Sequence, residues 1–245
     1  MRIENQARPA PLPRLLPRQL ALTFINHITF LMQLPGLNIL TVPVHCERVS
    51  PLRQIGPRRV RAPDLPFEAL PPVDLVLLSR EHYDHLKLDT LRRLGHAHRP
   101  LYLTGLGHGA ALRRAGLAQV RELDWWQQLE LPRATVTLTP AQHWSGRGLF
   151  ERNRTLWGRF HVRASDCAVH FAGDTGYGAH FHDIRRRLGP ADLALLPIGA
   201  YAPRGYEAPH HMDPDEAVRA HRDLAAPSLG GNPFWLLQAE RGGLR

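Results

Sequence analysis

The amino-acid sequence predicts an α+β protein built as a four-layer αββα sandwich, with two sheets packed face to face and helices outside. Short apolar runs of strand character follow one another along most of the chain, and single segments with helical spacing interrupt them. No internal repeat or linker stands out, so residues 19–224 are expected to form one domain. Residues 1–18 are rich in arginine and proline and lack an apolar signal-peptide core, which predicts a loose tail.

An antiparallel meander is expected at the start of this domain, because short β-rich runs are separated by turn residues at 26–27 and 35–36. Strands and single helices then alternate, and the last helix has Asp213 as its cap and Pro214 at its first position. The strands are expected at residues 20–24, 28–34, 37–40, 73–78, 101–104, 120–126, 134–138, 168–171 and 191–197, and the helices at 88–94, 105–116 and 214–224.

Composition places the chain among ordinary globular proteins, since 43% of its residues are hydrophobic and 22% are charged. No run of about 18 apolar residues is present, so no transmembrane segment is expected and a cytoplasmic location is the default. Cys46 and Cys167 lie far apart without a Cys-x-x-Cys pattern, and they predict neither a disulfide framework nor a thiolate zinc site.

The net charge of +9 could indicate a nucleic-acid partner. We expect a solvated surface instead, because Lys87 is the only lysine and the arginine clusters carry no interleaved aromatic residues that could stack bases.

The most informative stretch follows the strand expected at residues 73–78. It contains His82, Asp84 and His85, which a tight loop can turn toward one point. Loops at the carboxyl ends of strands commonly carry ligand sites in α/β folds. Imidazole nitrogens and carboxylate oxygens are the ligands that zinc-type ions prefer. From this stretch alone, a polar loop with incidental histidines is the alternative to a metal site.

Residues 79–86 read Ser-Arg-Glu-His-Tyr-Asp-His-Leu. This segment resembles the His-x-His-x-Asp-His signature of the metallo-β-lactamase fold superfamily. The nearest likeness is to the Ser-His-Asn-His-Tyr-Asp-His-Leu of the branch that includes N-acylphosphatidylethanolamine-hydrolysing phospholipase D and related bacterial hydrolases. Arg80 stands where that branch has its first histidine. The family stretch Thr-Pro-Ala-Gln-His-Trp-Ser-Gly-Arg is present at residues 139–147, and residues 148–158 also match closely.

Further segments extend the resemblance, with two departures. Ala-Gly-Asp-Thr-Gly at residues 172–176 supplies the family's bridging aspartate, and His-His-Met-Asp-Pro at residues 210–214 resembles its Gln-His-Met-Asp-Pro. Val42 stands where the family has an aspartate. The likeness covers roughly residues 18–224. Residues 225–245 are expected to be a tail unlike the family, so that the fold would lack its last strand and helix together with the final metal-binding histidine.

The resemblance implies a zinc-dependent hydrolase with two neighbouring metal sites. The first site keeps His82 and His143 and loses its third ligand to Arg80, because a guanidinium has no acceptor lone pair. Three protein ligands are a workable set for a catalytic zinc, so one ion is expected rather than two. The second site is expected to keep three ligands, namely Asp84, His85 and Asp174.

By likeness, the expected reaction is hydrolysis of an ester or phosphodiester through a metal-bound hydroxide, with an N-acylphosphatidylethanolamine-like lipid as one candidate substrate. Asp84 would orient the nucleophile and accept a proton, while Tyr83 and His211 would line the pocket or the second shell. Two alternatives stay open. Val42, Arg80 and the divergent tail favour a catalytically inactive relative, and the charge favours a nuclease of the same fold. The expected partner is a small-molecule or lipid substrate rather than nucleic acid, and homo-oligomer formation is left open.

Overall fold

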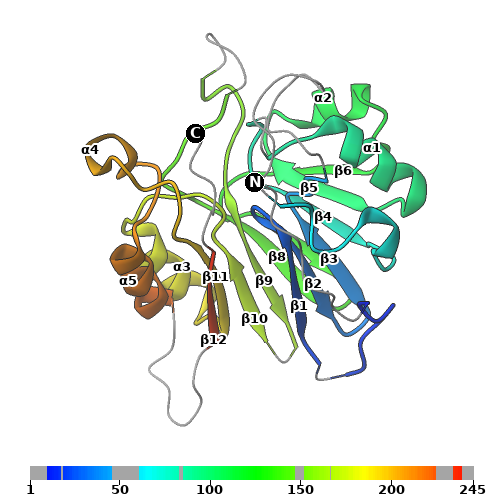
Figure 1. Cartoon of the computed structure of the whole chain (residues 1–245), viewed down its shortest axis with the longest axis horizontal. Coiled ribbons are helices and arrows are strands. Elements are labelled where there is room, and N and C mark those ends of the chain that lie inside the picture. The colour runs from blue at the N-terminus through cyan, green and yellow to red at the C-terminus, as the bar shows by residue number, and fades with distance from the viewer. Residues whose placement is uncertain are drawn as a thin grey trace. The chain divides into compact units, whose positions relative to one another are not determined.

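The structure, a computed structural model, describes residues 10–17, 19–45, 61–82, 85–146, 152–165 and 167–224, together with the backbone of residues 234–238. These residues form two compact units, whose elements are labelled in Figure 1. Unit 1 takes in the described residues up to Leu123 and those within Ser145–Leu156. Unit 2 takes in Asp124–Trp144 and the described residues from Trp157 onward. Each unit has its own six-stranded sheet and its own helices.

The sheet of unit 1 contains β1 (Ala21–Asn26), β2 (Thr29–Leu34), β3 (Leu37–Thr41), β4 (Leu75–Leu78), β5 (Leu101–Gly105) and β6 (Val120–Leu123). The order of the strands across the sheet follows their order in the sequence. The first three strands are antiparallel, as the predicted meander requires. The sheet continues from β3 to β6 as parallel strands, so the carboxyl ends of β3, β4 and β5 lie at one edge.

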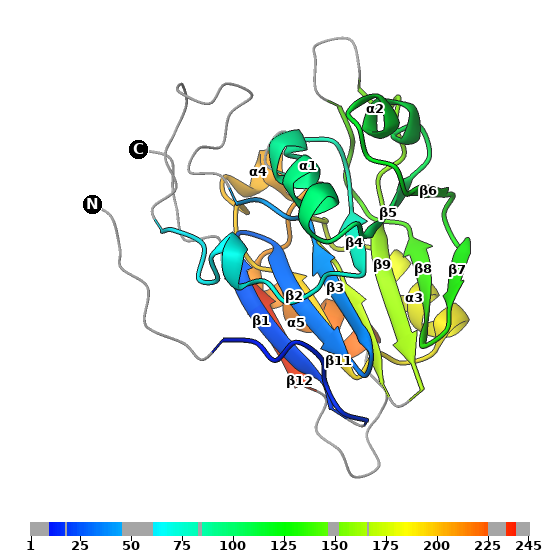
Figure 2. The same ribbon diagram turned by 90° about the vertical axis from the view of Figure 1, so that its right-hand side faces the viewer.

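Two helices, α1 (Leu88–Ala97) and α2 (Gly109–Arg114), pack on one face of this sheet (Figure 2). The apolar stripe of α1 buries Leu91 and Leu94 in a cluster that includes Val76 and Tyr102 of the sheet. A 3₁₀ turn, η1 (Phe67–Ala69), adds Phe67 to the same cluster. The helix α2 is shorter than the predicted range, because the chain remains in β5 as far as Gly105.

The sheet of unit 2 contains β7 (Gln128–Leu131), β8 (Ala134–Thr139), β9 (Arg159–Ala164), β10 (Ala168–Phe171), β11 (Leu193–Pro197) and β12 (Phe234–Gln238). Strands β7 to β10 are antiparallel neighbours. Strands β10, β11 and β12 are parallel. Because β9 runs against both of its neighbours, β8 and β10 point the same way, and β11 points with them.

Two helices, α3 (His180–Leu188) and α5 (Pro214–Leu224), lie side by side against one face of this sheet (Figure 1), and the short α4 (Arg204–Glu207) precedes α5. Phe181 of α3 and Ala217 of α5 belong to one buried cluster with Leu196 of β11. Asp213 caps α5 as predicted. Its carboxylate accepts from the Glu216 N–H at 2.8 Å, and the Glu216 carboxylate accepts from the Asp213 N–H at 3.1 Å, which is a reciprocal capping box.

The predicted fold class is confirmed, since the chain forms two sheets that each carry helices. The expected loss of the last strand is wrong. Residues 234–238 form β12, a parallel neighbour of β11. Their sequence, Phe-Trp-Leu-Leu-Gln, is an apolar run that can pair with an otherwise unpaired strand edge. The remaining residues of the divergent segment lie outside the described part of the chain.

Part of the predicted N-terminal tail contacts unit 1. Arg14 forms an ion pair with Asp74, while the carbonyls of Leu12 and Pro13 accept from the side-chain amides of Gln33 and Asn38. The boundaries of the predicted domain stay a prediction. Within the described residues, none of the helices is both long enough and apolar enough to cross a bilayer.

Candidate metal centre

Three loops of unit 2 leave the sheet at the same edge. The strands β8, β10 and β11 share one direction, so the segments that follow them begin side by side. His143 follows β8, Asp174 follows β10, and His211 lies in the segment between β11 and α5. The carboxyl ends of parallel strands are the usual place for ligand sites in sheets of this kind.

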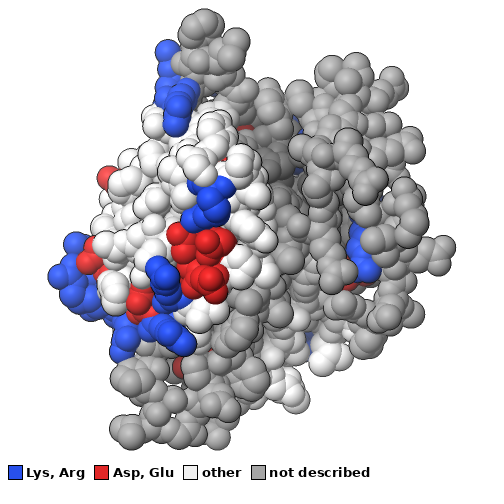
Figure 3. Space-filling view, turned by 60° about the vertical axis from the view of Figure 1, so that its left-hand side comes forward, with Lys and Arg blue, Asp and Glu red and all other residues white. Residues whose placement is uncertain are grey.

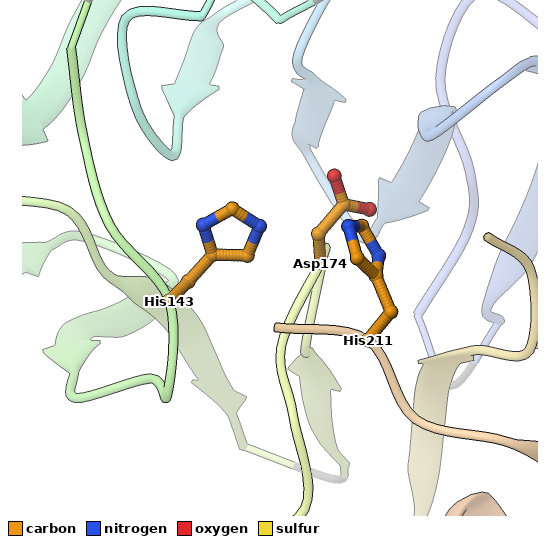
Figure 4. Close-up of side chains that lie close together, drawn as sticks. All are labelled: His143, Asp174 and His211. Atoms are coloured by element: carbon orange, nitrogen blue, oxygen red, sulfur yellow. The ribbon is translucent and has the colours of Figure 1, made fainter. Parts of the chain in front are cut away.

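These three side chains converge. Their ligand atoms, one from each residue, all lie within 4.8 Å of one another. In Figure 4 the imidazole of His143 faces the carboxylate of Asp174, and the ring of His211 stands beside that carboxylate. Asp174 is only 4% exposed. Two imidazoles around one buried carboxylate form a donor set that suits zinc, because zinc combines nitrogen and oxygen ligands and catalytic sites use three protein ligands.

The buried residue Thr175 joins the three loops through hydrogen bonds. Its hydroxyl oxygen accepts from the Gln142 N–H at 3.0 Å, and its carbonyl accepts from the Met212 N–H at 3.1 Å. The Gln142 carbonyl accepts from the Gly176 N–H at 2.9 Å. His143 is next to Gln142, Asp174 is next to Thr175, and His211 is next to Met212. The spacing of the three candidate ligands is therefore constrained by hydrogen bonds of their immediate neighbours, one of them to the Thr175 side chain.

In the loop after β10, the lack of a side chain at Gly173 lets the backbone lie close to the buried guanidinium of Arg159. Gly173 has a φ of +50°, and a Cβ at this position would lie 2.9 Å from Nε of Arg159, which is 1% exposed. His180 at the start of α3 lies 3.3 Å from the Thr175 hydroxyl. Burial lowers the pKa of His180 to about 4, and the charge of Arg159 acts in the same direction, so His180 is neutral at neutral pH.

His143 is oriented by its own backbone and by Trp157. Its Nδ1 lies 3.0 Å from the Trp144 carbonyl oxygen and 2.7 Å from the Trp144 amide nitrogen. The Trp144 N–H donates to Nδ1, whereas the Trp144 carbonyl would accept from Nδ1 if that atom carried the proton, as ligation through Nε2 requires. The indole N–H of Trp157 donates to the Ala141 carbonyl at 2.8 Å, two residues before His143. The matching stretch at residues 148–158 thus includes a residue that supports the ligand loop.

His211 is held from both of its flanks. Arg204 donates to the His211 carbonyl at 2.8 Å and to the Glu216 carboxylate at 2.7 Å, which ties the loop to α5. The Nε2 atom of His211 lies 3.8 Å from the Glu207 carboxylate. The side chain of His211 is 17% exposed, so the ring is accessible from one side.

A second group of histidines lies in unit 1, at the edge where β1, β3 and β4 end. His85 is fully buried, and its Nδ1 lies 3.3 Å from the Ser79 hydroxyl. Its ring centroid is 5.3 Å from that of His27 and 6.4 Å from that of His82. His27 lies in the turn after β1, and this turn reaches the same edge as the loop after β4.

Arg80 contacts His82 directly. The Arg80 Nε–H donates to Nδ1 of His82 at 2.9 Å, and Arg80 is only 2% exposed. A guanidinium nitrogen is always a donor, so Nδ1 of His82 must present its lone pair to it. A neutral imidazole has one lone pair and one N–H, which puts the proton of His82 on Nε2. In this arrangement His82 has no nitrogen lone pair to offer a cation.

The predicted site residues therefore divide into three groups. Unit 2 brings His143 and Asp174 together and adds His211, which the sequence suggested only as a pocket or second-shell residue. Unit 1 holds His82, His85 and Arg80. Two residues lie outside the described part of the chain, Tyr83 and Asp84.

Comparison with known proteins identifies the family. The model of the β-lactamase superfamily domain matches residues 38–229 of this chain. The chain belongs to the metallo-β-lactamase superfamily. Solved structures similar to this chain include both a metallo hydrolase and a diiron β-hydroxylase.

Sequence relatives refine this placement. The uncharacterized protein Rv0906 of Mycobacterium tuberculosis is 42% identical over 92% of this chain and 63% of its own length. The N-acyl-phosphatidylethanolamine-hydrolyzing phospholipase D 1 of Caenorhabditis elegans is 36% identical over 83% of this chain and 60% of its own length. The chain thus spans less than two thirds of these relatives.

Solved structures support the fold. The isothiocyanate hydrolase from Delia radicum gut bacteria superposes with a TM-score of 0.67 at 22% identity, over 89% of this chain and 83% of that protein. Igni18, a metallo hydrolase from Ignicoccus hospitalis, has a TM-score of 0.64 at 22% identity, over 84% of this chain and 78% of that protein. At this level of identity the likeness establishes the metallo-β-lactamase fold alone.

Proposed function

We propose that this superfamily hydrolase cleaves an ester or a phosphodiester, with a phospholipid of the N-acylphosphatidylethanolamine type as the candidate substrate. The observation that carries the proposal is the grouping of His143, Asp174 and His211 at one sheet edge of unit 2. The substrate class is supported by the relative in Caenorhabditis elegans, which is named for hydrolysis of that lipid.

Zinc is the cofactor we propose, because imidazole and carboxylate donors in a three-ligand set are typical of catalytic zinc. When bound, the ion would supply positive charge that lowers the pKa of water and stabilises the negative charge that develops during hydrolysis. His143 and Asp174 would contribute ligands to it, and the contacts of Thr175 would keep their spacing. Asp84 is proposed to accept a proton during the reaction.

Hydrolysis of bis(4-nitrophenyl) phosphate and of N-acylphosphatidylethanolamine in mixed micelles would test the proposal, with zinc supplied. We expect turnover that a chelator abolishes and that falls by about 100-fold or more in an Asp174→Asn variant. His182→Ala is the matched control, since His182 is 67% exposed and pairs with Asp223. Activity that survives both the chelator and Asp174→Asn would contradict the proposal.

A catalytically inactive relative is the second candidate, and the Arg80–His82 hydrogen bond favours it. It predicts a folded chain that hydrolyses neither substrate under any metal condition. The nuclease alternative predicts RNA cleavage and RNA binding that weakens steeply with salt. The cytoplasmic location and the oligomeric state stay predictions.

A further inference from the structure

We infer that one divalent cation binds to unit 2 through His143, Asp174 and His211, with His211 as a direct metal ligand. This inference rests on the proposed function, because it assumes a metal-dependent site. It goes beyond that function by assigning a coordinating role to a residue that the sequence motif leaves in the pocket or second shell. The single ion would be held entirely by loops that follow strands of one sheet.

The spacing of the three ligand atoms suits a small adjustment around an ion. Bond lengths of about 2.0–2.2 Å to zinc imply that tetrahedral ligand atoms lie roughly 3.4 Å apart. The observed atoms lie within 4.8 Å of one another, so a contraction of no more than about 1.4 Å brings them to that spacing. Hydrogen bonds among Gln142, Thr175, Gly176 and Met212 already join the three loops.

Both histidines have an oxygen atom near one ring nitrogen. A metal-bound histidine commonly directs its other ring nitrogen at a backbone carbonyl or a carboxylate. The Trp144 carbonyl lies 3.0 Å from Nδ1 of His143 and would accept from it if Nε2 bound the metal, in place of the Trp144 N–H that donates to Nδ1 at 2.7 Å. The Glu207 carboxylate lies 3.8 Å from Nε2 of His211, beyond hydrogen-bond distance.

Arg80 takes two potential metal donors away from the histidine group of unit 1. Arg80 has no lone pair of its own, and its Nε–H also fixes His82 in the tautomer whose proton sits on Nε2. A site that depended on these two residues would retain too few donors. The group in unit 2 contains three donors without either of them, and three is the number that catalytic zinc sites draw from the protein.

A hydrogen-bonded cluster of two histidines and one aspartate that holds no ion is the competing explanation of the same geometry. The two explanations differ in what a cysteine at position 211 would do. A thiolate that coordinates cobalt(II) produces an intense ligand-to-metal charge-transfer band in the near ultraviolet, and a thiol outside the coordination shell does not.

The experiment uses the full chain, stripped with a chelator and titrated with cobalt(II), in four forms: wild type, His211→Cys, His211→Ala and His210→Cys. His210 is the neighbouring residue, and its ring lies 5.5 Å from that of His143, so it controls for proximity. Circular dichroism establishes that each variant is folded. We expect one cobalt per wild-type chain, at least a 10-fold loss of affinity in His211→Ala, and the charge-transfer band in His211→Cys alone.

Each outcome decides a different claim. Cobalt bound by His211→Cys without the band, or wild-type affinity in His211→Ala, would overturn the role of His211 while leaving a metal-dependent hydrolase intact. A band in His210→Cys instead would transfer the role to that residue and would equally overturn the inference. A folded wild type that binds no cobalt and no zinc would overturn the inference and the proposed function together.

Discussion

At the scale of single residues, we expect Arg80 to limit metal binding in two ways. It stands where the resemblance implies a histidine ligand, and its Nε–H donates to Nδ1 of His82. We therefore expect Arg80→His to raise the metal content from one ion per chain to two, because it both adds an imidazole and releases His82. Elemental analysis of the folded protein after zinc loading measures this directly.

Arg80→Ala is the matched control for this change, because it removes the guanidinium without adding a ligand. It should free the His82 tautomer yet leave the count at one ion. Two ions in the wild-type chain, or one ion in Arg80→His, would show that Arg80 does not limit the metal content.

Thr175 is the residue whose hydroxyl joins the loops of His143 and Asp174, and it is fully buried. Thr175→Val keeps the shape of the side chain and removes that hydroxyl. Because the Gln142 N–H loses its acceptor, we expect the metal affinity to fall by about 10–100-fold, the usual cost of losing an outer-shell contact. Titration with zinc against a competing chelator measures the affinity. Unchanged affinity in a folded variant would mean that backbone contacts alone set the spacing.

At the scale of elements, the strand β5 ends in a position that only glycine fits. A Cβ on Gly105 would lie 2.3 Å from the Leu156 carbonyl oxygen, and that oxygen belongs to backbone that is hydrogen-bonded to Leu106. We expect Gly105→Ala to lower the free energy of unfolding by about 1–3 kcal/mol, the usual cost of overpacking. Urea denaturation measures it. Gly205→Ala is the control, since nothing lies within 4 Å of a Cβ there, and equal midpoints for the two variants would contradict the prediction.

The elements that the sequence predicted are those whose apolar residues are continuous, such as β4 and β11. The strand β9 was missed because Arg159 and His161 interrupt its apolar pattern, although the fold buries both of them. The strand β7 was missed because it is short and half polar. Sequence patterns record local composition, and they cannot show which polar residues tertiary neighbours will cover.

The sequence predicts which types of residue form the candidate site, but it identifies only some of the residues that the structure brings together. His143 and Asp174 were found through a motif and a turn, and the structure places them together. The convergence of His211 depends on the shared direction of β8, β10 and β11, which pairing within the sheet decides. The same is true of His27 beside His85 in unit 1.

At the scale of the whole molecule, charge is distributed as mixed pairs on the face drawn in Figure 3, where basic and acidic side chains lie next to one another. In unit 2, Arg204 pairs with Glu216 and Arg186 with Asp183. Among the described residues on this face, the charged side chains do not form the single-sign groove that nucleic-acid binding uses. We therefore expect no RNA binding that depends steeply on salt, which a filter-binding titration at low and physiological salt would measure.

Four histidines whose pKa is lowered by desolvation are expected to make the stability of the chain depend on pH. Burial lowers the pKa of His45, His161 and His180 to about 4 in each case, and it lowers that of His170 well below its ordinary value. Above pH 6.5 these groups are neutral in both states and contribute no pH dependence. Below pH 6.5 the histidines of the unfolded chain bind protons, whereas those of the folded chain stay neutral because their pKa is lower. The free energy of unfolding therefore falls as the pH drops from about 6.5 toward 4. For His45, His161 and His180, a pKa shift from 6.5 to about 4 corresponds to a loss of roughly 3 kcal/mol in the free energy of unfolding for each residue near pH 4.

We therefore expect the urea midpoint of the chelator-treated protein to be constant between pH 7 and 8 and to fall steeply below pH 6. His161 is the group to vary, since it lies directly opposite His170 across β9 and β10 and is 1% exposed. His161→Leu removes one titrating group from this buried pair and should make the decline shallower, whereas the exposed His182→Ala should leave its slope unchanged. An identical slope in His161→Leu would mean that other groups, such as carboxylates whose pKa the fold depresses, cause the acid unfolding.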